Sequence, residues 1–130
     1  MSRALRQKQR DQRWGRWSET IATWWLRAKG YHILDRRWRV KGGEIDIIAR
    51  KRRLIIFVEV KARRTVDAAR FAVTATKSQR VTHAAALWIS RKAASDPALH
   101  GHSYRLDAVL IAPWQLPCHV PDVAALDVFV

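Results

Sequence analysis

Two carboxylates and a lysine near the middle of the chain have the residue types and spacing of a site for metal-assisted phosphodiester hydrolysis. These residues are Asp46, Glu59 and Lys61. Like-charged carboxylates raise one another's pKa unless a cation joins them, and Mg²⁺ or Mn²⁺ suits a small set of carboxylates completed by water and phosphate oxygens. Such an ion polarises a phosphoryl group and lowers the pKa of an attacking water. We therefore predict Asp46 and Glu59 as metal ligands, and Lys61 as the group that orients water or neutralises developing charge.

These residues lie on two segments that together read as a β-hairpin. Residues 44–50 alternate in polarity, residues 54–62 are β-branched and aromatic, and a short charged run at 50–53 joins them. If Ile45 and Ile47 share a face with the apolar residues of the second strand, paired residue numbers sum to 103 or 105. The opposite face then gathers Glu44, Asp46, Glu59 and Lys61, with the Val60 carbonyl between them as a further predicted metal ligand.

A Glu and a Lys two residues apart on a strand are also common on the solvated face of an antiparallel sheet, and this plainer interpretation stays open. Three features favour a site. Residues 55–58 are strongly apolar, which indicates a strand with both faces covered. Acidic residues also occur in register on the neighbouring strand, and an acidic patch stands out in a chain that is otherwise strongly basic.

Elements on either side of the hairpin must position it. Apolar residues at three- and four-residue spacing predict a helix from about Trp14 to Gly30, where a glycine suits the left-handed position after a helix. The further expected elements are an extended segment at 31–40, a turn at 41–43, a helix at 76–94, a strand at 104–111 and a last strand near 126–130. This order predicts an α/β protein, a sheet flanked by helices. We expect one domain at 13–130 after a basic tail at 1–12.

The charge balance indicates a polyanionic partner. The formal net charge is +14, and the planar fork of arginine suits phosphate. We expect nucleic acid, with DNA favoured over RNA, although arginine-rich codon usage would give the same composition. An acidic membrane surface is the rival partner, but no lipidation motif is present and the basic residues are scattered along the chain. The predicted nucleic-acid contacts are Arg39, Arg50, Lys51, Arg52, Arg63 and Lys77.

Nothing in the sequence demands an oxidising compartment or a membrane. Cys118 is the single cysteine and cannot form an internal disulfide. No apolar run approaches the roughly 18 residues that span a bilayer, and no apolar segment follows the basic N-terminus as in a signal peptide. We therefore expect a cytoplasmic protein.

The tryptophans divide into two sets. Those on the expected inward faces of helices are predicted to lie in the core: Trp24, Trp25 and Trp88. Those among arginines either stack on unpaired bases or cover the edge of the core beneath arginine stems, and we favour cover: Trp14, Trp17 and Trp38.

Six sequence blocks form a specific pattern through their order and spacing. They are GRWSE (15–19), GYHILDRRWR (30–39), GEIDIIA (43–49), FVEVKAR (57–63), AVTATK (72–77) and YRLDAV (104–109). Together they resemble the YraN family of small bacterial proteins, which is similar to the PD-(D/E)xK nuclease superfamily and to archaeal Holliday-junction resolvases. The chain departs from this pattern at Arg37, where asparagine is common, and after Lys61, where an expected Phe-Gly pair is not kept.

The resemblance implies a restriction-endonuclease-like fold, with a central mixed sheet and a β-hairpin active site flanked by helices. It matches Asp46 to the aspartate of the motif, and Glu59 and Lys61 to its E-x-K. It also adds Glu19 on the first helix as a metal ligand and Lys77 at the start of the second helix as an auxiliary group. Glu44 is a second auxiliary candidate, and Asp107 is expected to be structural. Resolvase-like activity would call for a homodimer.

Three functions remain in competition. The first is a metal-dependent endonuclease that hydrolyses phosphodiester bonds in DNA, at structured or branched sites. The second is a non-catalytic nucleic-acid-binding module on the same fold, and the third is a scaffold whose partner is a protein. The complete set of acidic residues and lysine favours the first.

Overall fold

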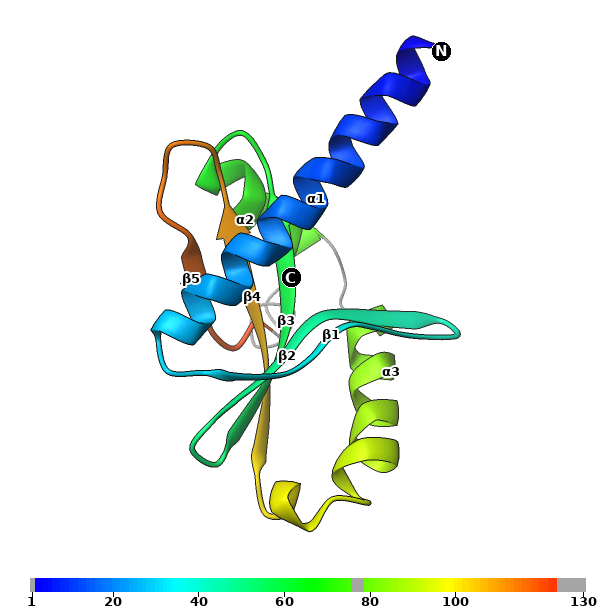
Figure 1. The fold of residues 1–130 in the computed structure, drawn as a ribbon, viewed down its shortest axis with the longest axis vertical. Coiled ribbons are helices and arrows are strands. Elements are labelled where there is room, and N and C mark those ends of the chain that lie inside the picture. Colours follow the sequence, from blue (N-terminus) through cyan, green and yellow to red (C-terminus); the bar gives the residue numbers. More distant parts are fainter. Residues whose placement is uncertain (1, 76–78, 124–130) are drawn as a thin grey trace.

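Five strands form one mixed sheet in the computed structural model, which describes residues 2–75 and 79–123. In spatial order they are β1 (His32–Val40), β2 (Gly43–Lys51), β3 (Leu54–Ala62), β4 (Ser103–Ile111) and β5 (Cys118–Val120). Neighbouring strands are antiparallel except β3 and β4, which are parallel. The helices are α1 (Arg3–Ala28), α2 (Val66–Ala75) and α3 (Gln79–Trp88), followed by a π-helical turn at Ile89–Ala93 and a 3-10 turn at Pro97–Leu99. The chain is thus a mixed α/β protein, as predicted (Figure 1).

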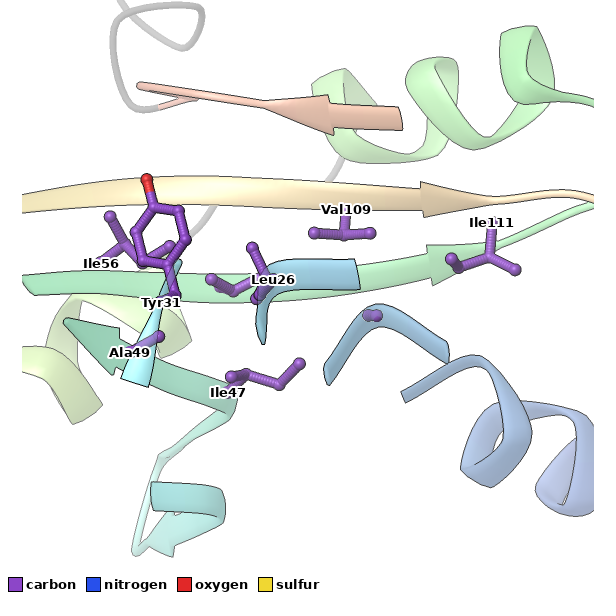
Figure 2. Packing of buried hydrophobic residues seen from close by; sticks show 9 residues of the cluster. Leu26, Tyr31, Ile47, Ala49, Ile56, Val109 and Ile111 are labelled. Carbon is purple, nitrogen blue, oxygen red and sulfur yellow. The ribbon is translucent and has the colours of Figure 1, made fainter. Parts of the chain in front are cut away.

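Helices cover both faces of the sheet. α1 packs on one face through Leu26, which lies with Tyr31 among the strand residues Ile47, Ile56 and Val109 (Figure 2). The parallel arrangement of β3 and β4 requires a crossover, and α2 and α3 lie on that connection. Consequently the central strands are enclosed from both sides, and β3 is buried as its apolar sequence predicts.

The second face packs against α3 and α2. Trp88 of α3 meets Phe57 of β3 edge-on, with 5.7 Å between the ring centroids. α3 approaches β2 closely at Gly43, where a Cβ atom would clash with the backbone oxygen of Arg80. Ala69 of α2 packs in a third cluster with residues of β4.

The hairpin of β2 and β3 has one of the two predicted registers. Ile47 pairs with Val58 and Lys51 with Leu54, so paired numbers sum to 105. The connection is a two-residue turn in which Arg52 has φ of +56°, a conformation typical of such turns.

α1 is longer than its apolar pattern predicts. It begins at Arg3, within the segment expected to be a tail, and the Ser2 hydroxyl accepts a hydrogen bond from Leu5 N–H at 3.2 Å. Residues 2–6 are exposed, and the N-terminal half projects beyond the sheet (Figure 1). The predicted stop is confirmed, since Gly30 has φ of +95° and Tyr31 N–H bonds back to Leu26 at 3.0 Å.

The tryptophan predictions are confirmed in part. Trp88 is buried, and Trp38 covers the core edge beside α3. Trp25 is half-buried, but Trp24 is 64% exposed, so its predicted core position is wrong. Trp17, favoured as a cover, is 65% exposed. The reason is that α1 contacts the sheet through a narrow line containing Ala22 and Leu26, and helical geometry turns Trp17 and Trp24 away from it. The Trp14 side chain lies outside those described.

Two elements were missed from sequence. α2 occupies a segment expected to be a connection, although Thr65 Oγ1 accepts a hydrogen bond from Ala68 N–H at 3.0 Å and marks its start. The second helix was expected at 76–94, but α3 begins at Gln79, and residues 76–78 lie outside the described ones. β5 is too short to show periodicity. The strand at 104–111 is confirmed, whereas the one near 126–130 lies outside the described residues.

No helix within residues 2–75 and 79–123 is long and apolar enough to cross a membrane.

Candidate active site

Asp46 lies where β2 separates from β3. The paired register of the two strands ends at Ile47 and Val58. One residue further, the Asp46 carboxylate accepts a hydrogen bond from Val60 N–H, with 2.8 Å between Oδ2 and N. The side chain thus replaces a backbone acceptor. Because the N–H and C=O of a strand residue face the same neighbour, the Val60 carbonyl faces this edge as well. A carboxylate oxygen and a carbonyl oxygen are therefore both available there.

The alternation of β2 breaks at Asp46. Ile47 packs beneath α1, whereas Ile45 packs with the α3 cluster on the other face. On β1, Arg37 falls at the level of Asp46 and has φ of +50°. Our prediction that Ile45 and Ile47 share a face is therefore wrong, because the two paired strands twist together at Arg37 and Asp46. This twist turns Asp46 toward the edge of β3.

Glu59 and Lys61 form an ion pair on β3. Lys61 Nζ lies 2.9 Å from Glu59 Oε1, and the two side chains are 21% and 14% exposed, the lysine being the more exposed. Their spacing of two places them on one face of the strand, as predicted. Shielding from water strengthens such a pair relative to an exposed one, so the lysine is held beside the carboxylate.

Glu19 reaches the site from α1 and is almost fully buried. The Arg37 Nε lies 3.0 Å from both carboxylate oxygens, and the Arg36 Nε lies 3.7 Å from Oε1. A buried carboxylate is stable only when it is paired, and these two guanidinium groups provide the partners. Thus α1 and β1 together bring a third carboxylate to the level of Asp46.

The electrostatics of Asp46 connect these groups. The pKa of Asp46 is raised from 3.8 to about 6 as the net result of three effects. Burial is the largest and raises it, the hydrogen bond from Val60 N–H lowers it, and the charges of Glu19, Glu59 and Glu44 raise it. The like charges are therefore close enough to disfavour ionisation of Asp46. A cation at this position would reverse their effect.

The donor set fits a hard divalent cation. Asp46 and Glu59 supply carboxylate oxygens and Val60 a carbonyl, and Mg²⁺ typically takes one or two carboxylates and keeps several waters. Among the residues that the structure describes, no three acidic, histidine or cysteine side chains are already gathered to hold a metal. Instead, Glu19 and Glu59 are each paired with a basic side chain. Binding of an ion would thus compete with these ion pairs.

The predicted nucleic-acid contacts separate into two regions. Arg39 is 3.5 Å from Glu44 across β1 and β2, and both side chains are well exposed. Arg63 follows β3 and is exposed. In contrast, Arg50, Lys51 and Arg52 lie at the opposite end of the hairpin, and Arg52 is six residues from Asp46, about 20 Å along a strand. Lys51 stands over the Tyr31 ring at 5.5 Å. Lys77 lies outside the described residues.

Arg36 and Arg37 contact the site but were not among the predicted residues. The signal for Arg37 was its departure from the sequence pattern on which the family resemblance rests. A φ of +50° is one that arginine adopts less readily than asparagine. Here the arginine conformation is accompanied by its two-pronged contact with Glu19.

A second buried charge cluster lies around Asp107, apart from this site. Arg105 donates two hydrogen bonds to Asp107, at 2.7 and 2.8 Å, and the His119 Nε2 lies 2.7 Å from its Oδ2. Burial alone would raise the pKa of Asp107, but hydrogen bonds from Arg105, His119 and the backbone of Asp122 outweigh burial and hold it at about 2. Lys29 at the end of α1 contacts the other nitrogen of His119. The cluster ties α1, β4 and β5 together, as expected for a structural aspartate.

Fold and site together define a mixed α/β protein with carboxylates and a lysine gathered at a strand edge. Residues 18–111 match the Uncharacterised protein family UPF0102. A UPF0102 protein of Bartonella tribocorum is 42% identical over 123 residues, which cover 93% of this chain and 92% of that protein. One of Paramagnetospirillum magneticum is 43% identical over 126 residues (94% and 95%), and one of Bradyrhizobium diazoefficiens is 49% identical over 110 residues (85% and 78%). The chain belongs to the UPF0102 family, which includes YraN, and the predicted family is confirmed.

Proposed function

We propose that this protein is a metal-dependent endonuclease with a restriction-endonuclease-like fold that hydrolyses phosphodiester bonds in structured or branched DNA. The observation that carries the proposal is the position of Asp46. Its carboxylate stands at the edge of β3, bonded to Val60 N–H, within electrostatic reach of Glu19, Glu59 and Glu44. An arrangement that brings like charges together around a strand edge is costly without a cation and useful with one.

Each residue has a role in this proposal. Asp46, Glu59 and the Val60 carbonyl would hold Mg²⁺ or Mn²⁺, and Glu19 would assist from α1. When bound, the ion would supply Lewis-acid polarisation of the phosphoryl group and a water of lowered pKa. Lys61, which pairs with Glu59, carries a positive charge that can neutralise an oxygen on which negative charge develops.

Arginines around the site would bind the substrate backbone. Arg36 and Arg37 are only partly engaged with Glu19, since their side chains are 38% and 42% exposed. Arg39 on β1 and Arg63 directly after β3 add exposed positive charge. Guanidinium groups suit phosphate because their donors form a planar fork.

One observation favours the second candidate, a nucleic-acid-binding module without catalysis. The Glu19 and Glu59 carboxylates are already neutralised by Arg37 and Lys61, so they are satisfied without metal. In that case the same basic surface would bind nucleic acid, and the acidic residues would serve stability.

A substrate panel separates the two candidates. Purified protein is given branched, flapped, single-stranded and duplex DNA and matched RNA, with Mg²⁺, Mn²⁺ or EDTA. We expect metal-dependent cleavage of branched DNA, and a loss of at least about a hundredfold in Lys61→Ala, because one lost charge-stabilising group costs that much in comparable sites. Lys92→Ala, at an exposed lysine in the π-helical turn, is the matched control and should cut normally. Cleavage of no substrate, or equal cleavage by Lys61→Ala, would rule out the endonuclease.

A further inference from the structure

α1 carries an exposed line of arginines and tryptophans on the side away from the sheet. We name it the α1 stripe, and its members recur at helical spacing: Arg3, Arg6, Trp17, Trp24 and Arg27. The partly buried Thr20 lies on the same line between the two tryptophans. In the sequence, Arg10 and Arg13 continue the same spacing. The two indole rings are among the most exposed apolar groups of the described residues, at 65% and 64%. The stripe lies on the helix that projects from the body of the protein (Figure 1).

The stripe has the features of a stacking surface. The guanidinium carbon of Arg27 lies 5.3 Å from the centroid of the Trp24 ring. This contact supports one face of the ring, while the ring as a whole is still largely exposed. Trp17 lies two helical turns earlier, about 10 Å along the axis. That distance is about three times the base-to-base rise of a stacked strand, so each ring would take a different base.

The charge of the stripe selects an anionic partner. The first turn of α1 contains no acidic residue, and Arg3 and Arg6 stand near its positively charged end, where the helix dipole disfavours them. Bound phosphate groups would offset both effects. A second copy of α1 would instead add like charge along the same line, so the stripe is poorly suited to self-association.

The mixing of the two residue types favours nucleic acid over a membrane. Helices that lie on a membrane place apolar and basic residues on different faces. In the α1 stripe, Trp17 and Trp24 lie on the same line as Arg27 and the N-terminal arginines. Single-stranded nucleic acid requires this combination, because its phosphates alternate with bases that have exposed faces.

We propose that the α1 stripe binds an unpaired stretch of nucleic acid, with Trp17 and Trp24 stacked on bases and the arginines on phosphates. The proposal rests on the proposed function in taking nucleic acid as the substrate. Arg36 links the stripe to the site, because its Nη2 lies 3.5 Å from Thr20 Oγ1 and its Nε lies 3.7 Å from Glu19. A junction with an unpaired arm could thus contact α1 and the carboxylates together, which favours branched over fully paired substrates.

The test measures base-dependent affinity without cleavage. Fluorescence anisotropy in EDTA compares a thymidine oligonucleotide with an abasic strand of the same length, using the Lys61→Ala protein. We expect the thymidine strand to bind at least about tenfold more tightly. The double variant Trp17→Ala/Trp24→Ala should lose this preference, with about tenfold weaker binding for each ring removed. Binding to the abasic strand should change little.

Two further variants make the result specific. Trp17→Phe/Trp24→Phe keeps two aromatic faces and should keep most of the preference. Trp114→Ala removes a fully exposed tryptophan elsewhere and should behave as the Lys61→Ala parent. Circular dichroism would verify that α1 stays helical.

Three outcomes would overturn the proposal. In the first, the double alanine variant keeps the full preference for bases. In the second, that variant loses binding only to anionic lipid vesicles, which would assign the stripe to a membrane. In the third, sedimentation finds a dimer that the variant dissociates while base preference persists, which would assign it to a second copy. None of these measurements depends on cleavage. A protein that lacks nuclease activity can therefore be distinguished from one whose α1 stripe does not bind nucleic acid.

Discussion

At the scale of the residue, Asp46 decides what the site can do. Its carboxylate accepts a hydrogen bond from the Val60 N–H at 2.8 Å. Burial, with a smaller contribution from the neighbouring carboxylates, raises its pKa to about 6. Such a residue costs stability when it is ionised without a cation, and in the proposed function it would gain an interaction from a bound metal. The same physical property would therefore link folding, pH and the proposed metal binding at one position.

We predict that Asp46→Asn stabilises the metal-free protein at about pH 7.5. The folded pKa of about 6 exceeds the ordinary value of 3.8, so the folded state holds this proton more tightly. Stability from this group is therefore largest at low pH and is lost as pH rises from about 4 to about 6. Asparagine avoids the loss and can still accept the Val60 hydrogen bond, so the free energy of unfolding should rise by about 1–3 kcal/mol. Denaturant unfolding in EDTA measures it.

Two internal controls accompany this prediction. The difference between the variant and the wild type should shrink as the pH falls toward about 4, where Asp46 is protonated in the wild type. Mg²⁺ should raise the melting temperature of the wild type far more than that of Asp46→Asn. An equal response of both proteins to Mg²⁺ would contradict the assignment of Asp46 as a ligand.

At the scale of the element, the site depends on where strands stop pairing. β2 pairs with β3 only from Ile47 onward, so Asp46 lies just before the paired region. A residue with positive φ, Arg37, accompanies the twist on β1. α1 then supplies Glu19, while a separate buried cluster at Asp107 fixes the end of α1 to β4 and β5. These elements therefore come together at two charged clusters. The cluster around Asp46 is proposed to be functional, and the cluster around Asp107 is proposed to be structural.

We predict that Asp107→Asn destabilises the fold. The pKa of Asp107 is held at about 2, below 3.8, so its contribution is fully present above about pH 4 and is lost as pH falls toward about 2. Removing the carboxylate leaves Arg105 without its partner, and since Arg105 is partly exposed we expect a loss of about 3 kcal/mol at neutral pH. Urea unfolding at about pH 7 measures this loss of unfolding free energy.

The control variant is Asp67→Asn, at an exposed position in α2. It should change the free energy of unfolding by less than about 0.5 kcal/mol. An equal effect of both variants would contradict the prediction.

At the scale of the whole molecule, a net charge of +14 surrounds a small group of carboxylates. Positive charge is present on the β1–β2 hairpin at Arg39, on the turn at Arg52 and along α1. This distribution would attract a polyanion from several directions, while the carboxylates around Asp46 would be available to the proposed metal. In the proposed function, arginines around the site and along α1 would therefore bind the substrate, and the carboxylates around Asp46 would bind the metal.

We predict that affinity for duplex DNA falls steeply with salt, because each neutralised phosphate adds about 0.9 to the logarithmic slope on B-DNA. Arg3→Ala/Arg6→Ala should lower the magnitude of that slope by about 1 for each phosphate that the variant no longer neutralises. Arg91→Ala, at an exposed position just after α3, should leave it unchanged. A titration of binding against salt measures the slopes, and an affinity that barely depends on salt would contradict a nucleic-acid partner.

Local patterns in the sequence determined much of the fold. The stop of α1 at Gly30 and the strand at Ser103–Ile111 follow from glycine conformation and β-branched composition, which act over a few residues. Alternation narrowed the hairpin to two registers, and the structure decided between them. The pairing of Glu59 with Lys61 on one strand face follows from the same two-residue period. α2 was missed although Thr65 marks its start, because ten residues without a long apolar stripe resemble a connection.

Only the tertiary structure decided how the site is assembled. Alternation predicted one face for Ile45 and Ile47, but the twist at Asp46 and Arg37 separates them, and no local pattern encodes a twist shared by two strands. Likewise, the contact of Glu19 with Arg37 joins residues 18 positions apart. The exposure of Trp24 depends on which face of α1 packs against the sheet. The candidate site residues could be predicted from the sequence because the chemistry of a side chain depends on its residue type. Their burial, pKa values and contacts depend on tertiary packing, which the structure alone determines.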